Sequence, residues 1–194
     1  MFKKILFTTV STSLILFAES GVGININNKD LELEGIIDSR NLAALQTSST
    51  IYQADLNFIN ADSDDKLFGV GLGATNKLEG TQGVELTFGL KYMWVEVKDE
   101  SLNALPLMVK IRYDFPPLMF NIPPVAIEAK GVYAPKALSF GDSEEYSEMR
   151  FSADIEMIEN VKIYAGYRNI HAGYKHIKSD LFDTGFYGGL KITY

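Results

Sequence analysis

The stretch Ala104–Phe115, ALPLMVKIRYDF, decides the fold class, because its residues alternate between two chemically unlike faces. One face carries Leu105, Leu107, Val109, Ile111, Tyr113 and Phe115, and the other carries Met108, Lys110, Arg112 and Asp114. A period of two predicts a β-strand. The run is also long enough for the roughly 9–11 residues of a tilted membrane-spanning strand, whereas a globular strand has about five or six.

The same alternation recurs through residues 51–194. We expect eight core strands, at Ile51–Asn60, Lys66–Asn76, Val84–Lys98, Ala104–Phe115, Val125–Pro135, Tyr146–Ile158, Val161–Tyr174 and Gly185–Tyr194. Turn-like segments separate them, at Ala61–Asp65, Lys77–Gly83, Asp99–Asn103, Pro116–Pro124, Lys136–Glu145, Glu159–Asn160 and Ser179–Thr184. Strands joined in sequence order, without long helices between them, predict an all-β, up-and-down antiparallel arrangement.

Residues 21–49 decide whether the barrel has eight strands or ten. Leu31–Ile37 alternates well, and together with Gly23–Asn27 it could add a hairpin to the sheet. Because closed bacterial barrels use even numbers of strands, we expect eight strands, or ten if this hairpin joins.

A soluble sandwich and a transmembrane β-barrel both bury one face of such strands. Aromatic residues near the strand ends favour the barrel, as in an interfacial belt; Trp94, Tyr113 and Tyr133 are examples. The last strand of the sequence also ends on an aromatic residue, Tyr194, within an alternating pattern. We therefore predict a single barrel domain over residues 21–194.

The charged residues of these strands must face the lumen. Arg or Lys at the midplane of the lipid face costs roughly 2–4 kcal/mol, and a domain's net stability is only about 5–15 kcal/mol. The inward set is Lys110, Arg112, Glu148, Arg150 and Asp154. Its nearly even mixture of signs predicts a packed, salt-bridged lumen more than an open pore.

The first twenty residues have the order of a secretory signal peptide. Lys3 and Lys4 precede an apolar run from Ile5 to Phe17, and Ala18-Glu19-Ser20 places small residues at −3 and −1. This order predicts cleavage near Ser20. The alternative, an uncleaved anchor, is disfavoured because the run is shorter than the roughly 20 residues of a spanning helix.

Composition excludes several classes of function. The chain has no Cys, so disulfides, thiolate catalysis, Cys metal sites and a lipid-bearing Cys are excluded. Its formal charge of −7 argues against a nucleic-acid partner.

Three sets of residues were weighed as sites, and none is retained. His171, His176 and Ser179 could support acyl transfer only if a carboxylate oriented a histidine, so we interpret them as interfacial or loop residues. Two acidic turns could attract Ca²⁺, but the first lacks the glycine and distal glutamate of an EF-hand loop. The turns contain Asp62, Asp64 and Asp65, and Asp142, Glu144 and Glu145.

The glycines at 69, 71 and 73 are not followed by a helix, so they do not form a phosphate loop. We expect them to face the lumen and to give room to long side chains such as Lys91. We thus expect no catalytic, cofactor-binding or metal-binding residues, and no cofactor.

Several motifs follow one another in a characteristic order: Asp62-Ser63-Asp64-Asp65 with Gly69-Val70-Gly71-Leu72-Gly73, Gly131-Val132-Tyr133-Ala134-Pro135, Gly141-Asp142, Tyr146-Ser147-Glu148, Ala165-Gly166-Tyr167-Arg168 and Tyr187-Gly188-Gly189-Leu190. By this order the sequence resembles the YfaZ family of outer-membrane proteins over roughly Ile51–Tyr194. It implies an outer-membrane location in a Gram-negative cell and supplies no activity. The strand Gly185–Tyr194 also resembles the signal read by the barrel-assembly machinery, which implies that machinery and periplasmic chaperones as transient partners.

Three classes of function remain open. The first is a structural or interaction barrel with a filled lumen, in contact with outer-membrane lipids and lipopolysaccharide and monomeric. The second is a small, low-conductance porin, and the third is a lipid-modifying enzyme.

Overall fold

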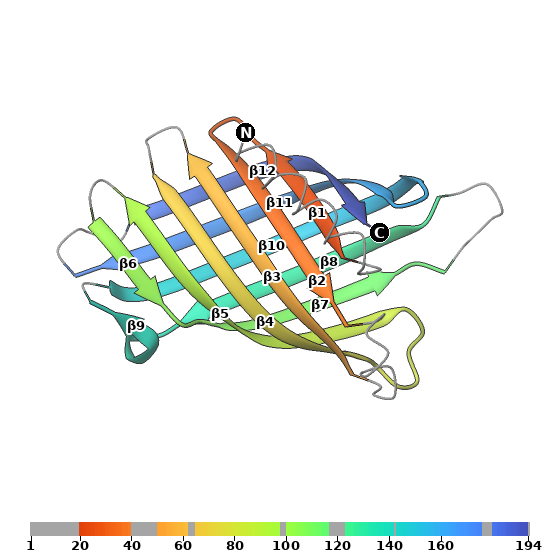
Figure 1. The fold of residues 1–194 in the computed structure, drawn as a ribbon, viewed down its shortest axis with the longest axis horizontal. Helices are drawn as coiled ribbons and strands as arrows, with labels where there is room; N and C mark the ends of the chain where they lie inside the picture. The colour runs from red at the N-terminus through yellow and green to blue at the C-terminus, as the bar shows by residue number, and fades with distance from the viewer. Residues whose placement is uncertain are drawn as a thin grey trace, which may run out of the picture.

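The computed structural model describes residues 20–39, 50–61, 65–97, 100–116, 123–141, 143–175 and 180–193. Over these residues the chain forms an antiparallel β-barrel (Figure 1). Within the same ranges, no helix has the length and apolar character needed to cross a membrane. Residues 1–19 of the predicted signal peptide and the terminal Tyr194 lie outside the described part, so both remain predictions.

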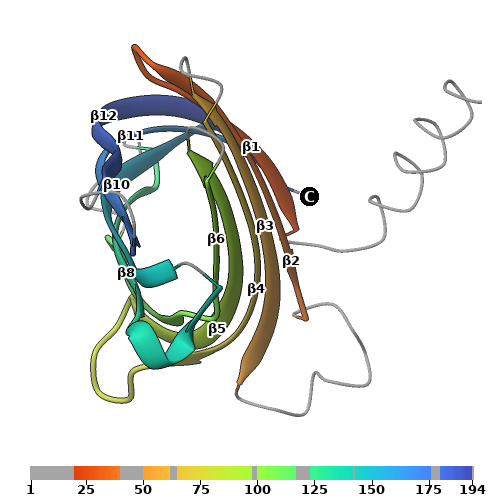
Figure 2. The same cartoon turned by 90° about the vertical axis from the view of Figure 1, so that its left-hand side faces the viewer.

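The strands follow one another around the barrel nearly in sequence order. They are β1 (Gly21–Ile26), β2 (Asp30–Asp38), β3 (Ile51–Ala61), β4 (Lys66–Lys77), β5 (Val84–Val97), β6 (Glu100–Ala104), β7 (Leu107–Asp114), β8 (Val125–Ala134), β9 (Ser139–Phe140), β10 (Ser143–Ile158), β11 (Val161–Tyr174) and β12 (Asp180–Thr193), with a short 3-10 helix η1 (Lys136–Leu138). β1 pairs with β12, from Gly21 opposite Thr193 to Ile26 opposite Gly188, and this pairing closes the ring. Figure 2 shows the strands running around a closed, flattened ring.

The N-terminal hairpin joins the barrel, which confirms the ten-stranded alternative. β1 and β2 are its two strands, and Gly21 of β1 pairs with Ile36 of β2. β2 in turn pairs with β3 along its whole length, so the hairpin lies between the first core strand and the last. The predicted up-and-down order is confirmed as well.

One crossing of the barrel is broken in two at Pro106. β6 and β7 both pair with β5, β6 along Met93–Val97 and β7 along Val84–Leu90. Pro106 has no N–H to donate, although its carbonyl accepts a hydrogen bond of 2.9 Å from the backbone N–H of Lys91. The prediction of a turn at Asp99–Asn103 is therefore wrong for residues 100–103, which continue the sheet.

Two other strands begin earlier than alternation predicts. β10 begins at Ser143 and β12 at Asp180, within segments expected to be turns. Register shifts occur here, between Ser143 and Glu145 and between Ile170 and His171. A bulge moves the following side chains to the opposite face. Alternation is therefore lost while backbone pairing continues.

The two faces of the wall have the expected chemistry. Phe186 and Leu72 are 81% and 67% exposed on the outer surface, where a membrane protein meets lipid. The charged side chains predicted to face inward line the lumen, and Glu148 and Arg150 are buried. The end of the barrel where Gly21 and Thr193 pair is called the termini end, and the opposite end is called the far end.

Candidate functional site

Arg168 on β11 lies at the centre of an ion-pair network inside the lumen. Its side chain is fully buried and contacts carboxylates from two other strands. The guanidinium donates to Glu32 Oε2 at 2.6 Å, to Asp183 Oδ2 at 2.5 Å and to Asp30. The ring of Tyr187 lies 5.5 Å from its central carbon. A buried charge is tolerated when it is paired in this way.

Arg150 on β10 makes the second set of cross-lumen contacts. It donates to Glu32 at 2.8 and 2.9 Å and to Glu34 at 2.9 Å, both on β2. It also bonds Glu148 on its own strand at 2.5 Å, and Glu148 accepts the Tyr146 hydroxyl hydrogen at 2.8 Å. Arg150 and Arg168 thus tie β10 and β11 to β2 across the lumen. The predicted salt-bridged lumen is confirmed.

Four cations lie side by side along the wall. Lys110 is directly opposite Lys130, Lys130 opposite Arg150, and Arg150 opposite Arg168; these four residues are called the cation row. Like charges directly opposite one another destabilise a sheet. Acids on β2 compensate at the arginine end of the row, where Glu32 alone contacts both guanidinium groups.

Another buried cation, Lys91 on β5, is held by residues of β3. Its Nζ lies 2.6 Å from Asp55 Oδ1 and donates to Asn57 Oδ1 at 3.0 Å. A Cβ added at Gly69 would overlap Asn57, and one added at Gly71 would overlap Asp55. These glycines face the lumen and make room, as predicted. The room is occupied by the two partners of Lys91.

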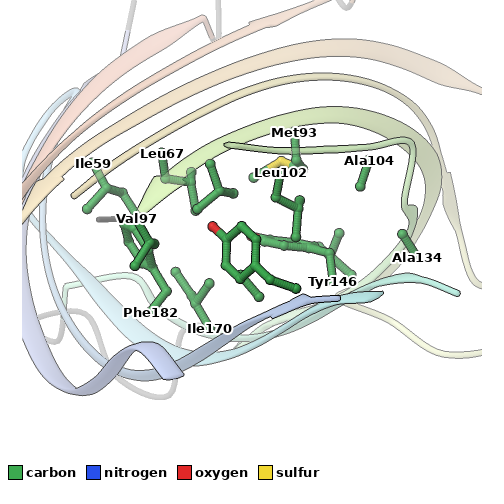
Figure 3. Packing of buried hydrophobic residues seen from close by; sticks show 14 of the residues in the cluster. Ile59, Leu67, Met93, Val97, Leu102, Ala104, Ala134, Tyr146, Ile170 and Phe182 are labelled. Atoms are coloured by element: carbon green, nitrogen blue, oxygen red, sulfur yellow. The ribbon is translucent and has the colours of Figure 1, made fainter. Parts of the chain in front are cut away.

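Toward the far end the lumen is filled by apolar side chains, called here the apolar plug. Its members are Ile59, Leu67, Met93, Val95, Val97, Leu102, Ala104, Met108, Val132, Ala134, Tyr146, Ile170, Ala172, Tyr174 and Phe182. Figure 3 shows Leu67, Leu102 and Tyr146 pointing toward one another inside the barrel. Leu138 of η1 packs against the plug, and its carbonyl accepts the Leu105 N–H at 2.8 Å.

Toward the termini end the lumen holds a polar cavity of about 480 Å³, called the vestibule. It reaches that end of the barrel, because Asp114, Asn160 and Thr193 are among its lining residues. Other charged residues of its lining include Glu34, Lys110, Arg112, Glu128, Lys130 and Lys191. Arg112 is engaged there by Asp154, in a two-pronged contact of 2.6 and 3.1 Å.

The histidine weighed as a catalytic group points away from the lumen. His171 follows lumen-facing Ile170 on β11, and its Nε2 lies 3.9 Å from Glu145 Oε1 on the neighbouring strand. His176 and Ser179 lie outside the described residues. Ser147 of β10 lies directly opposite His171 in the sheet.

The acidic turns are only partly described. Asp65 is buried at the start of β4, and Glu144 lies 3.3 Å from Lys136. Asp62, Asp64 and Asp142 lie outside the described residues. Within the described ranges, no group of three or more His, Cys, Asp or Glu side chains could hold a metal ion.

Sequence reasoning missed the apolar plug and the vestibule. In Tyr92-Met93-Trp94-Val95 both faces of the strand are apolar, so alternation gives no contrast between them. The structure places Met93 and Val95 in the plug and leaves Tyr92 exposed outside. Apolar residues on both faces near strand ends were the available signal for a plugged lumen.

Comparison with known proteins gives a family and several similar barrels. The model of the family described as YfaZ precursor matches residues 3–194. No curated protein matches the chain. Among solved structures, the NanC porin is 8% identical with a TM-score of 0.44, over 90% of this chain and 98% of that one. A bacterial polysaccharide outer membrane secretin is also 8% identical with a TM-score of 0.44, over 90% and 69% of the two chains. The outer membrane channel DcaP of Acinetobacter baumannii is 9% identical with a TM-score of 0.41, over 89% and 54%.

Proposed function

Since the chain belongs to the YfaZ family and forms an outer-membrane β-barrel with buried salt bridges, we propose that it is a non-conducting barrel of structural or interaction type. Its lumen is mostly filled, and its outer wall contacts lipid. The observation that carries this proposal is the apolar plug.

The plug supports a closed lumen because its side chains converge from most of the wall. β3 and β4 contribute Ile59 and Leu67, and β10 contributes Tyr146 from another part of the ring. These three side chains have no exposed surface. A hydrophobic constriction excludes water, and an ion that loses its hydration shell meets a large barrier.

The ion-pair network supplies a second obstruction. Glu32 on β2 is bonded by Arg150 and Arg168, so side chains span the lumen from opposite walls. A pore would need these groups to separate and rehydrate. Removing one partner from a buried pair typically costs about 3–5 kcal/mol, and we expect the network to stay closed.

Planar-bilayer recording tests the proposal. The wild-type barrel is expected to give no single-channel steps. A Leu102→Ala/Tyr146→Ala double variant, which empties the middle of the plug, is expected to give them. Tyr133→Ala is the matched control, because Tyr133 is an exposed aromatic residue on the outer face, and it should stay silent. Steps from the wild-type protein would contradict the proposal.

The vestibule favours a second candidate function, a small low-conductance porin. A charged cavity of about 480 Å³ already occupies part of the lumen. Conduction would then require the plug to open during gating. The same recordings separate the two candidates, because a porin gives steps without any substitution in the plug.

Export and assembly form part of the proposal. We infer that the signal peptide is removed near Ser20, which is buried beside the first residue of β1. Because β12 is the strand that closes the ring against β1, we also propose Gly185–Tyr194 as the segment recognised by the barrel-assembly machinery. Periplasmic chaperones would deliver the monomer, and lipopolysaccharide would surround it. Mass spectrometry of the purified protein tests the cleavage site, since a mature chain beginning at Gly21 is expected.

A further inference from the structure

The vestibule contains lysines whose ammonium groups make no close contact with a carboxylate. Lys110 Nζ lies 3.9 Å from its nearest carboxylate partner, Glu128, and donates to the Gln53 amide oxygen at 3.4 Å. Lys130 Nζ lies 3.7 Å from Glu148, which already bonds Arg150 at 2.5 Å. Charge-assisted hydrogen bonds between ammonium and carboxylate are usually about 2.7–2.9 Å long.

Lys191 on β12 is the third member of this set. It lines the vestibule, and its ammonium group makes no hydrogen bond or ion pair with any other residue that the structure describes. Glu128 is the acid that attracts both Lys110 and Lys191, whereas Lys130 lies closest to Glu148.

The arginines of the lumen differ from these lysines. Arg112 contacts Asp154 at 2.6 Å, and Arg150 contacts Glu148 at 2.5 Å. Their charges are matched by direct contacts within the protein. The lining as a whole holds more acids than bases, so its unmatched positive charge is local. It lies at Lys110, Lys130 and Lys191, which are called the lysine set and make no carboxylate contact of this length.

We infer that the vestibule is a binding site for a small, water-soluble oxyanion, a phosphate or carboxylate group held by the lysine set. The cavity volume of about 480 Å³ lies within the roughly 300–1,000 Å³ of typical small-molecule sites. Lys110 and Lys130 retain 15% and 13% of their side-chain exposure, so their ammonium groups are accessible from the cavity. The ligand enters from the termini end, because the apolar plug lies toward the far end.

The rim of the vestibule restricts which anions fit. Glu85, Asp114 and Glu156 line it close to the strand ends at the termini end. These acids repel long polyanions, whereas a compact solute can pass them and reach the deeper lysines. The ligand class is therefore a small solute with a single oxyanion group, and this assignment goes beyond the role proposed for the barrel.

Isothermal titration of the full-length barrel in phosphate-free detergent solution tests this site, with inorganic phosphate and acetate as probes. Saturable binding of at least one probe is expected, and it should weaken as ionic strength rises. Lys110→Gln and Lys191→Gln should each weaken that binding about tenfold or more, since each removes a charged donor. Lys136→Gln is the matched control, because Lys136 is 70% exposed on η1, outside the cavity, and it should bind as the wild type does.

Glu128→Gln gives the sharpest readout. Removing the carboxylate that competes with the ligand for Lys110 and Lys191 should tighten binding, the opposite sign to the lysine variants. A merely structural role would make the lysine and glutamate variants change in the same direction, and that result would overturn the inference. Absence of saturable binding by either probe would also overturn it. Heat-dependent gel migration confirms that each variant is folded, and single-channel recordings test the proposed function independently.

Discussion

Replacement of Glu32 by glutamine should destabilise the barrel strongly, because this carboxylate joins both cross-lumen arginines. Glu32 accepts hydrogen bonds of 2.8 and 2.9 Å from Arg150, 2.6 Å from Arg168 and 2.9 Å from Asn25. The amide keeps the size of the side chain but removes its charge and directs an NH₂ group toward cations. Loss of one partner of a buried ion pair costs about 3–5 kcal/mol, so we expect a decrease of this size in the free energy of unfolding.

Urea unfolding in lipid vesicles measures the effect. The fluorescence of Trp94, the single tryptophan, reports the transition from β5. With a slope of about 1–3 kcal/mol per molar urea, the midpoint should fall by at least ~1 M. Glu34→Gln is the matched control, since Glu34 bonds Arg150 alone and its side chain is 26% exposed; its cost should be about 1 kcal/mol. Equal effects of the two substitutions would refute the central role of Glu32.

Two further predictions concern the two faces of the wall. Gly71→Val should lower stability by about 1–3 kcal/mol, because a side chain there overlaps its lumen neighbour, whereas Gly131→Val, with open space around its Cβ position, should be tolerated. Refolding yield and urea midpoint measure the difference, and a tolerated Gly71→Val would contradict the packing described. Leu72→Arg on the lipid face should cost about 2–4 kcal/mol in vesicles. Leu78→Arg, in the turn after β4, should change the unfolding free energy little, and equal costs would contradict the assignment of Leu72 to the lipid midplane.

The wall of the barrel could be predicted from the sequence because its chemistry is local. A polar residue between two apolar ones, such as Lys110 between Val109 and Ile111, assigns the faces of β7 without any knowledge of its neighbours. The same contrast assigned Arg150 and Glu148 to the lumen. At a bulge the alternation of faces is interrupted although the strand continues. For that reason alternation predicts turns where the first residues of β10 and β12 lie.

The contents of the lumen could not be predicted to the same depth. The alternation within one strand shows which side chains face the lumen. Which ion-pair partner each of them contacts depends on other strands that are distant in sequence. Glu32 and Arg168 are separated by 136 positions, and no spacing rule connects them. The vestibule depends on the closed ring as well, because its lining residues come from strands as distant in sequence as β2 and β12.

The long separation between β2 and its arginine partners also has a consequence for the rate of folding. Contacts between positions 116 to 138 residues apart carry a high cost of loop closure, so they form late, after the intervening hairpins have paired. Interactions that are absent from the transition state affect the rate of unfolding more than the rate of folding. The ion pairs that cross the lumen therefore slow unfolding more than they speed folding, and they lengthen the lifetime of the assembled barrel in the membrane.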